Sequence, residues 1–459
     1  RNGATLKQSF ATNINHMAAI DPANAAEYNL AVKRMRGTES ASSGIQPINI
    51  LYPISDYVLH IRPEYTFSVR TVSDRTAYIE RGNGENLKSY FMTFGSTALT
   101  CSGDEYTNIF PAWNWTRIPG TTNMQIATIP QRAQWGVKGI SKFVGGASDS
   151  LYAVTTYMHK DVTNGSTTSA NKSWFFFDDE IVCLGSGITT DYTGGITTSI
   201  EQSLKKGDIT VSNGDVETVL SEGLVQYKDN ISWIHHNNVG YFFPKGGDVR
   251  IDNGSKTGSW NEINTTQSTG DITKDVFSTF FYHGATPQNE SYAYIIVPNK
   301  KTPVEVAAYN TENIEILENN ACMQVVHHKT LDIWQMVFFE AGTFTSQELS
   351  VSVDKACVLM LKDIKTPKAI MHIADPAQSK SVITVKTKVS SISSEWVETI
   401  CNFAGLSDEE AGFTKKYIIK GPKPTLYTRE SGLTADTYVQ GGSSADLNYG
   451  SVDNILIKK

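Results

Sequence analysis

The sequence predicts a mainly β protein, in which a large antiparallel β-sandwich is followed by a smaller C-terminal β-sandwich. Charged residues make up only 19% of the 459 residues, while glycine is abundant, which is typical of large β-rich chains with many turns. Runs rich in β-branched and aromatic residues, such as 173–177 and 292–297, recur along the chain. Clusters of Gly, Asn, Ser and Thr join them, for example at 164–167, and these residues favour turns.

The first 37 residues are predicted to be helical. Asp21-Pro22 is typical of an N-cap followed by proline at the first helical position, and Gly37 is well placed to end a second helix. Two short helices cannot form a domain alone, so we expect residues 1–47 to be the end of a larger helical domain with its linker, most of it preceding this chain. The apolar residues that define the first helix recur at positions 6, 10, 14, 17 and 20.

The pattern changes to strands from about residue 48, and four further segments are predicted. Residues 48–303 are expected to form the central sandwich, and 304–385 the smaller β domain. Residues 386–424 are Ser-rich, then acidic, then rich in Gly and Pro, which predicts a connector. The last segment, 425–459, is too short to make a sandwich of its own.

Charge and cysteine content exclude several functions. The formal net charge of -7 argues against a general nucleic-acid binder, although a local arginine cluster still permits an anionic sugar ligand. The five cysteines are scattered without CxxC spacing, so neither a disulfide framework nor a zinc site is expected. No apolar run approaches the roughly 18 residues of a membrane span, and no signal peptide is visible.

The stretch 80–86 carries the first candidate site. Gly82 and Gly84 permit backbone conformations that a β-carbon would forbid. Glu80 and Asn83 are three residues apart across a predicted tight turn, so a carboxylate and an amide could point into one pocket and hold a polar ligand. The alternative is an ordinary hairpin turn, since Gly and Asn fill such turns for conformational reasons alone.

Seven motifs, taken together, show a family resemblance over roughly residues 1–385. The chain resembles the bacterial polysaccharide lyases that include chondroitin AC lyase, hyaluronate lyase and xanthan lyase, with the chondroitin AC branch most similar. These motifs occur in the family's order at 80–86, 103–106, 110–115, 117–122, 173–178, 180–185 and 240–244.

The resemblance implies a fold and an activity. It implies that the N-terminal helices end an α/α toroid domain that faces the sandwich across a cleft. Enzymes of this family cleave a glycosidic bond beside a uronic acid by β-elimination. The acid group must be neutralised while a base removes the C5 proton and an acid protonates the leaving oxygen. In the family, Asn, His, Tyr and Arg of the helical domain do this, and we expect them to precede Arg1. No metal or cofactor is implied.

Four residues are candidates for the site. By resemblance, Arg1 is the second arginine of an Arg-x-x-x-Arg helix motif that binds the sugar or its acid groups; the alternative is that Arg1 has no role. Glu80 matches the family's acid that orients the catalytic His and Arg, and Asn83 matches its partner that contacts substrate. Trp135 is a candidate stacking platform for a pyranose, or alternatively a core tryptophan.

The substrate prediction is a glycosaminoglycan such as chondroitin sulfate or hyaluronan, with xanthan as an alternative. A non-catalytic carbohydrate-binding β-sandwich protein is the competing function. The stretch 435–451 is similar to the opening of a DNRLRE-type β module, which is found on secreted bacterial proteins. We therefore expect a secreted or periplasmic bacterial protein.

Overall fold

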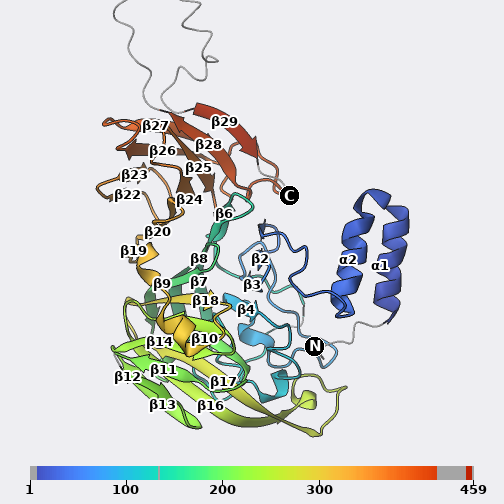
Figure 1. Ribbon diagram of the computed structural model, residues 1–459. Helices are drawn as coiled ribbons and strands as arrows, with labels where there is room; N and C mark the ends of the chain where they lie inside the picture. Colours follow the sequence, from blue (N-terminus) through green and yellow to red (C-terminus); the bar gives the residue numbers. More distant parts are fainter. Residues whose placement is uncertain (1–7, 133–134, 215, 421–450, 457–459) are drawn as a thin grey trace, which may run out of the picture.

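The computed structural model describes residues 8–132, 135–214, 216–420 and 451–456. It opens with two helices, α1 (Gln8–Ile20) and α2 (Ala25–Met35), joined by the 3-10 turn η1 (Pro22–Asn24). The helices pack on each other beside the sheets (Figure 1). Pro22 begins η1, and Gly37, at a φ of +69°, follows the end of α2. The helical prediction for this part is confirmed where it is described.

The apolar stripe of α1 is largely exposed. Phe10, Met17 and Ile20 have exposed fractions of 53%, 47% and 79%. Within the described residues, α1 therefore turns an uncovered apolar face away from the sheets. None of the described helices has the length and hydropathy that a transmembrane segment requires.

Five antiparallel sheets make up the rest of the described chain. The first contains β1 (Ile48–Tyr52), β2 (Tyr57–Arg62), β3 (Tyr65–Arg70) and β4 (Ser96–Thr100). The second contains, in spatial order, β13 (Gly223–Lys228), β16 (Asp248–Ser259), β17 (Asp271–Tyr282), β10 (Ile196–Leu204) and β5 (Thr122–Met124). The nine-stranded third sheet contains β12 (Val216–Val219), β11 (Thr210–Asn213), β14 (Ile231–His236), β15 (Val239–Phe242), β18 (Glu290–Pro298), β9 (Ile181–Thr190), β8 (Ser166–Phe176), β7 (Ala153–Thr163) and β6 (Val144–Ser148).

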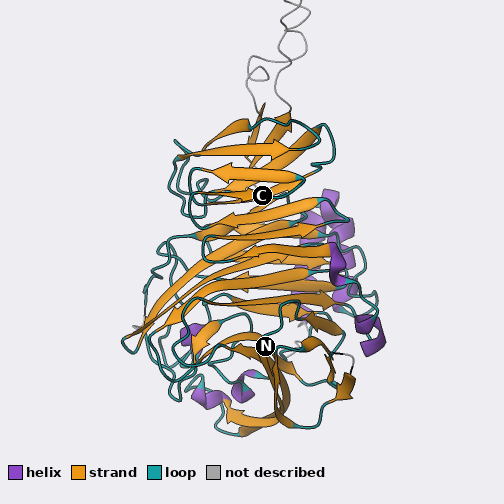
Figure 2. Ribbon diagram, turned by 90° about the vertical axis from the view of Figure 1, so that its left-hand side faces the viewer, coloured by secondary structure: helices purple, strands orange, loops and turns teal. Residues whose placement is uncertain are grey.

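Two further sheets form the C-terminal part, reached through α3 (Pro303–Ala307) and η5 (Thr311–Asn313). The seven-stranded sheet contains β19 (Ile314–Asn319), β20 (Met323–His328), β21 (Ile333–Phe338), β24 (Cys357–Lys362), β25 (Lys368–Ala374), β28 (Lys415–Lys420) and β29 (Ser451–Leu456). The last sheet contains β22 (Gly342–Thr345), β23 (Leu349–Val353), β26 (Val382–Val389) and β27 (Val397–Asn402). Figure 2 shows these C-terminal sheets stacked at one end of the molecule.

The central strands of the nine-stranded sheet are buried on both faces, whereas its edge strand β12 is exposed. Trp174 and Phe176 point into a core shared with the first two sheets, because side chains alternate along a strand. Phe175 and Phe177 point the other way, into a core shared with the seven-stranded sheet. A third core lies between the seven-stranded sheet and the last sheet. The layers therefore stack as a large sandwich joined to a smaller one, and the predicted fold class is confirmed.

The structure differs from the predicted connector over 386–424. Strand β26 continues to Val389 between β23 and β27, and β28 pairs with β25. Alternate residues of β26 are buried, as on a strand with one face in a core. The Ser-rich and acidic residues that suggested a connector lie largely in the loops on either side of β27. The residues behind the DNRLRE resemblance lie outside the described residues except for 451–456, whose backbone pairs with β28.

Candidate functional site

The stretch 80–86 forms a tight turn between non-strand segments. The backbone N–H of Glu85 donates to the carbonyl of Gly82 at 2.8 Å. Asn83 and Gly84 between them both have positive φ, at +53° and +75°, as the central residues of a type I′ turn do. No described strand flanks this turn, so the ordinary β-hairpin that the sequence left open is not formed.

Backbone contacts hold the turn against the rest of the sandwich. The side-chain amide of Asn86 donates to the carbonyl of Glu80 at 2.8 Å. The carbonyl of Gly84 accepts from the backbone N–H of Thr265 at 2.9 Å, and Leu87 N–H donates to Ile263 at 3.0 Å. The turn is therefore fixed at both ends by hydrogen bonds that do not involve the carboxylate of Glu80 or the amide of Asn83.

The two predicted polar residues of the turn face solvent. Glu80 and Asn83 are both exposed, and neither side chain hydrogen-bonds to another residue in the part of the chain that the structure describes. Their acceptor and donor groups are therefore available to a ligand or to a further protein segment. Arg1, the remaining predicted catalytic residue, lies outside the described residues.

Trp135 covers Gly82. A β-carbon on Gly82 would lie 2.3 Å from Cζ2 of Trp135, so the indole rests directly on the glycine backbone. The Trp135 side chain is nonetheless 55% exposed, which excludes the alternative of a core tryptophan. The absence of a side chain at Gly82 is thus explained by the close approach of an aromatic ring. The structure brings Glu80, Asn83 and Trp135 together around one turn.

A groove of about 640 Å³ lies beside this turn. Its lining comes from four separate parts of the chain: Arg81, Leu87, Lys88, Trp113–Thr116, Ile126–Ile129, Gln131 and Glu262. Lys88 forms an ion pair with Glu262 across the groove lining. Nε of Arg81 is buried without a hydrogen-bond partner in the described structure. The groove therefore combines two cationic side chains, one of them paired with a carboxylate, with aromatic and amide groups, and Arg81 is the cation without a partner there that could meet an acidic sugar chain.

The sequence did not predict Arg81, Lys88 or Gln131 as groove residues. Each is an ordinary polar residue in its own segment, and only the fold places the three segments side by side. The spacing of Trp113 and Trp115, two residues apart, predicts that they share one face of a strand in the core. They follow η3 (Phe110–Ala112) in a loop instead, with ring centroids 5.6 Å apart, and they pack against the core while also lining the groove.

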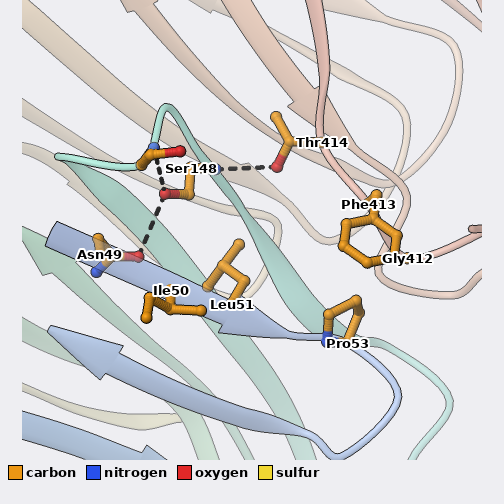
Figure 3. A pocket seen from close by; sticks show the side chains of 9 residues that line it. Asn49, Ile50, Leu51, Pro53, Ser148, Gly412, Phe413 and Thr414 are labelled. Atoms are coloured by element: carbon orange, nitrogen blue, oxygen red, sulfur yellow. Dashed lines mark hydrogen bonds between the residues drawn. The ribbon is translucent and has the colours of Figure 1, made fainter. Parts of the chain in front are cut away.

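A second pocket is too small for a sugar. It has a volume of about 30 Å³ and lies between β1, β6 and the segment 412–414 (Figure 3). Ser148 donates to Asn49 Oδ1 at 3.3 Å through its hydroxyl, and to Thr414 Oγ1 at 3.0 Å through its backbone N–H. A space of this size is large enough for only about one or two water molecules. This pocket is a packed contact between the two sandwiches.

The sequence contains two adjacent histidine pairs, His235-His236 and His327-His328, and they lie on the strands β14 and β20. His236 packs on the Phe277 ring, with centroids 4.2 Å apart, while its neighbour His235 bonds to the carbonyl of Lys300 at 2.9 Å. The neighbouring side chains thus face in opposite directions. Among the described residues, no group of three or more His, Cys, Asp and Glu side chains could hold a metal ion.

A stacked multi-sheet β-sandwich with an exposed aromatic ring and polar groups beside an open groove is an arrangement that suits a carbohydrate ligand. A model of the polysaccharide lyase family 8 super-sandwich domain matches residues 47–310, and a model of that family's C-terminal beta-sandwich domain matches residues 315–384. The chain belongs to polysaccharide lyase family 8, which confirms the family resemblance found in the sequence.

Relatives with curated functions agree with this family. Chondroitinase-AC of Pedobacter heparinus is 36% identical over 379 residues, which cover 81% of this chain and 52% of the relative. Xanthan lyase of Bacillus sp. is 30% identical over 347 residues, covering 72% of this chain and 36% of the relative. The chain thus spans about half or less of the length of the curated relatives it matches.

Solved structures agree as well. The structure of chondroitinase AC lyase in enzyme–oligosaccharide complexes matches with a TM-score of 0.83 and 33% identity, covering 89% of this chain and 60% of that one. The structure of Paenibacillus xanthan lyase matches with a TM-score of 0.73 and 25% identity, covering 84% of this chain and 39% of that one.

Proposed function

We propose that this chain forms the β-domain wall of the substrate cleft of a polysaccharide lyase that cleaves a uronate-containing polysaccharide by β-elimination. The observation that carries the proposal is the turn at 80–86. It presents a free carboxylate, a free amide and an exposed indole beside a groove with two cationic residues, in a chain of polysaccharide lyase family 8.

Each residue of the turn has a role in this proposal. Glu80 orients the histidine and arginine of a helical domain, because a carboxylate fixes both an imidazole tautomer and a guanidinium. Asn83 donates or accepts a hydrogen bond from the sugar. Trp135 provides a flat apolar surface for one pyranose face. Arg1 pairs with the sugar acid group through charge-assisted hydrogen bonds.

The proton-handling groups belong to the helical partner in this proposal. An asparagine neutralises the uronate carboxylate, a histidine and a tyrosine exchange protons with C5 and the leaving oxygen, and an arginine assists them. We place these groups in a helical domain preceding Arg1, of which α1 and α2 are the end. The exposed apolar stripe of α1 supports this arrangement, since it offers a face for further helices.

The substrate class follows from the relatives. Chondroitinase-AC is more similar than xanthan lyase in both identity and coverage, so a glycosaminoglycan such as chondroitin sulfate or hyaluronan is the substrate we propose. Polymers of this size are degraded outside the cytoplasm, so we also propose a secreted or periplasmic location.

The activity test compares this chain with the longer protein that includes the residues encoded upstream of Arg1. We expect the longer protein to release unsaturated oligosaccharides from chondroitin sulfate, measured by ultraviolet absorbance, and this chain alone to release none. Strong turnover by the chain alone would contradict the division of roles. Binding of glycosaminoglycans by both proteins, with no product from either, would favour the carbohydrate-binding alternative.

Replacing Trp135 by alanine should weaken oligosaccharide binding at least about 5-fold, because a stacked aromatic ring contributes about 1 kcal/mol beyond the area it buries. The free energy of unfolding should change by less than about 0.5 kcal/mol, since the side chain is more than half exposed. Isothermal titration calorimetry and urea denaturation measure the two quantities.

Trp396 is a matched control for Trp135. It is 43% exposed in the C-terminal part of the chain, just before β27 and away from the groove lining. Trp396→Ala should leave oligosaccharide affinity unchanged. Equal losses of affinity in the two variants would show that the indole of Trp135 is not a specific platform.

A further inference from the structure

A buried carboxylate close to the turn receives four hydrogen bonds. Asp161 lies on β7 with a side chain that is only 4% exposed. Its Oδ1 accepts from Nη2 of Arg132 at 3.0 Å and from the hydroxyl of Tyr78 at 3.2 Å. Its Oδ2 accepts from the hydroxyls of Thr163 at 2.6 Å and Tyr90 at 3.4 Å. The carboxylate is thus fully engaged on both oxygens.

The guanidinium of Arg132 is held by aromatic rings as well as by Asp161. Its central carbon lies 3.5 Å from the centroid of the Tyr78 ring and 3.8 Å from that of Tyr90. The Arg132 side chain is only 14% exposed. Burial also raises the pKa of the Tyr78 and Tyr90 hydroxyls, so both remain neutral donors to Asp161. A largely desolvated cation between two rings makes strong cation–π contacts.

This cluster connects the segments that carry the proposed site. Tyr78 and Tyr90 flank the turn at 80–86 on its two sides. Arg132 precedes Trp135 by three residues, and the indole of Trp135 rests on Gly82. Asp161 anchors the whole cluster to β7, an inner strand of the nine-stranded sheet. Neither Arg132 nor Asp161 lines the groove, so any effect on a ligand acts through other residues.

We propose that Arg132 and Asp161 are positioning residues, whose ion pair fixes the turn carrying Glu80 and Asn83 against the indole of Trp135. This inference rests on the proposed function, because the alignment matters only if these three side chains meet one substrate. Breaking the pair leaves a buried carboxylate with only neutral donors and releases the segment that precedes Trp135 from β7, while the turn keeps the bonds that Tyr78 and Tyr90 donate to Asp161. Misplacement of contact groups by about 1 Å is enough to cost roughly 100-fold in rate.

The experiment replaces Arg132 by methionine and by lysine in the protein that turns over substrate. We expect Arg132→Met to lower kcat/KM on the order of 100-fold. Arg132→Lys should restore part of the loss, because lysine keeps a charge toward Asp161 but lacks the flat face that packs between the rings. In Arg132→Met, misplacement of Glu80 should change kcat more than KM. Misplacement of Trp135 should raise KM.

Arg250→Met is the matched control. Arg250 pairs with Asp248 at 3.1 Å and lies 3.9 Å from the centroid of the Tyr282 ring. Its replacement by methionine therefore removes an ion pair and a cation–π contact of the same kinds, but elsewhere in the sandwich. Arg250→Met should lower the thermal stability as much as Arg132→Met does, but it should leave kcat/KM unchanged. Equal falls in kcat/KM for Arg132→Met and Arg250→Met would overturn the proposal, since the pair would then contribute only to stability.

A structural measurement separates this inference from the proposed activity. Hydrogen exchange of the amides at 78–90 and oxidation of Trp135 should both be faster in Arg132→Met than in Arg250→Met. If exchange is faster in Arg132→Met but the parent protein acts on no uronate polymer, the positioning is supported and the proposed function is rejected. Unchanged exchange and oxidation would overturn the positioning whatever the activity. If Arg132→Met does not fold, Arg132→Lys gives the same comparison.

Discussion

Replacing Glu80 by glutamine is expected to lower the turnover number of the active protein on the order of 10³-fold, within the range typical of lost acid–base support. The neutral amide cannot hold an imidazole tautomer and a guanidinium as a carboxylate does. Oligosaccharide affinity should change little, because Asn83, Trp135 and the groove remain. Folding should be unaffected, since the carboxylate of Glu80 is exposed and the contact from Asn86 uses the Glu80 carbonyl.

Glu85→Gln is the control for this prediction. Glu85 is an exposed carboxylate on the same turn, and it accepts a bond from the Asn264 side chain at 3.3 Å. The change in charge is therefore the same while the position differs. Steady-state kinetics and direct binding measure the two expectations. A Glu80→Gln variant with the wild-type rate would remove Glu80 from the site, and an equal loss in Glu85→Gln would indicate a general electrostatic effect.

Much of the fold could be predicted because burial leaves a clear pattern in this sequence. The run Trp174–Phe177 is apolar at every position, and such a run signals a strand that is buried on both faces. The structure explains the run by the two cores on either side of β8. The turn at 80–86 could be predicted for a related reason, since Asn-Gly has a strong conformational preference that does not depend on tertiary contacts.

Other features depend on contacts that no local pattern records. The Ser-rich and acidic residues after Val389 predict a connector, and only the pairing of β27 with β26 and of β28 with β25 shows that this part of the chain belongs to the sandwich. Arg81 is brought to the groove by a turn whose direction is set by the backbone bonds to Ile263 and Thr265. The bond between Arg132 and Asp161 joins residues 29 positions apart, so neither residue attracts notice in the sequence.

Buried histidines should make the chain sensitive to acid. Burial lowers the pKa of His159, His236 and His283 to about 3 and of His372 to about 4, and lowers the pKa of His60 well below its usual value. Each is neutral when folded but takes up a proton below about pH 6.5 when unfolded. Burial raises the pKa of Glu201 to about 8. Between about pH 8 and 4.5 the folded protein therefore holds a proton on Glu201 that the unfolded chain does not, which reduces the net proton uptake on unfolding by one.

The sign of the effect follows from this proton balance. Stability from the five histidines is complete above about pH 6.5 and is lost as the pH falls toward their folded-state pKa values. With a net uptake of about four protons, the free energy of unfolding should fall by about 5 kcal/mol per pH unit. Because domains are typically stable by about 5–15 kcal/mol, we expect unfolding to begin between about pH 5.5 and 4.

Urea denaturation at several pH values measures this slope, and a single variant can locate its origin. His236→Gln should reduce the slope below pH 6.5 by about one proton, because glutamine does not titrate and its carbonyl can still accept the 3.0 Å bond from the Lys206 backbone N–H. His16→Gln, a change on the exposed surface of α1, should leave the slope unaltered. A slope that is the same in wild type and His236→Gln would show that the buried imidazole does not control acid stability.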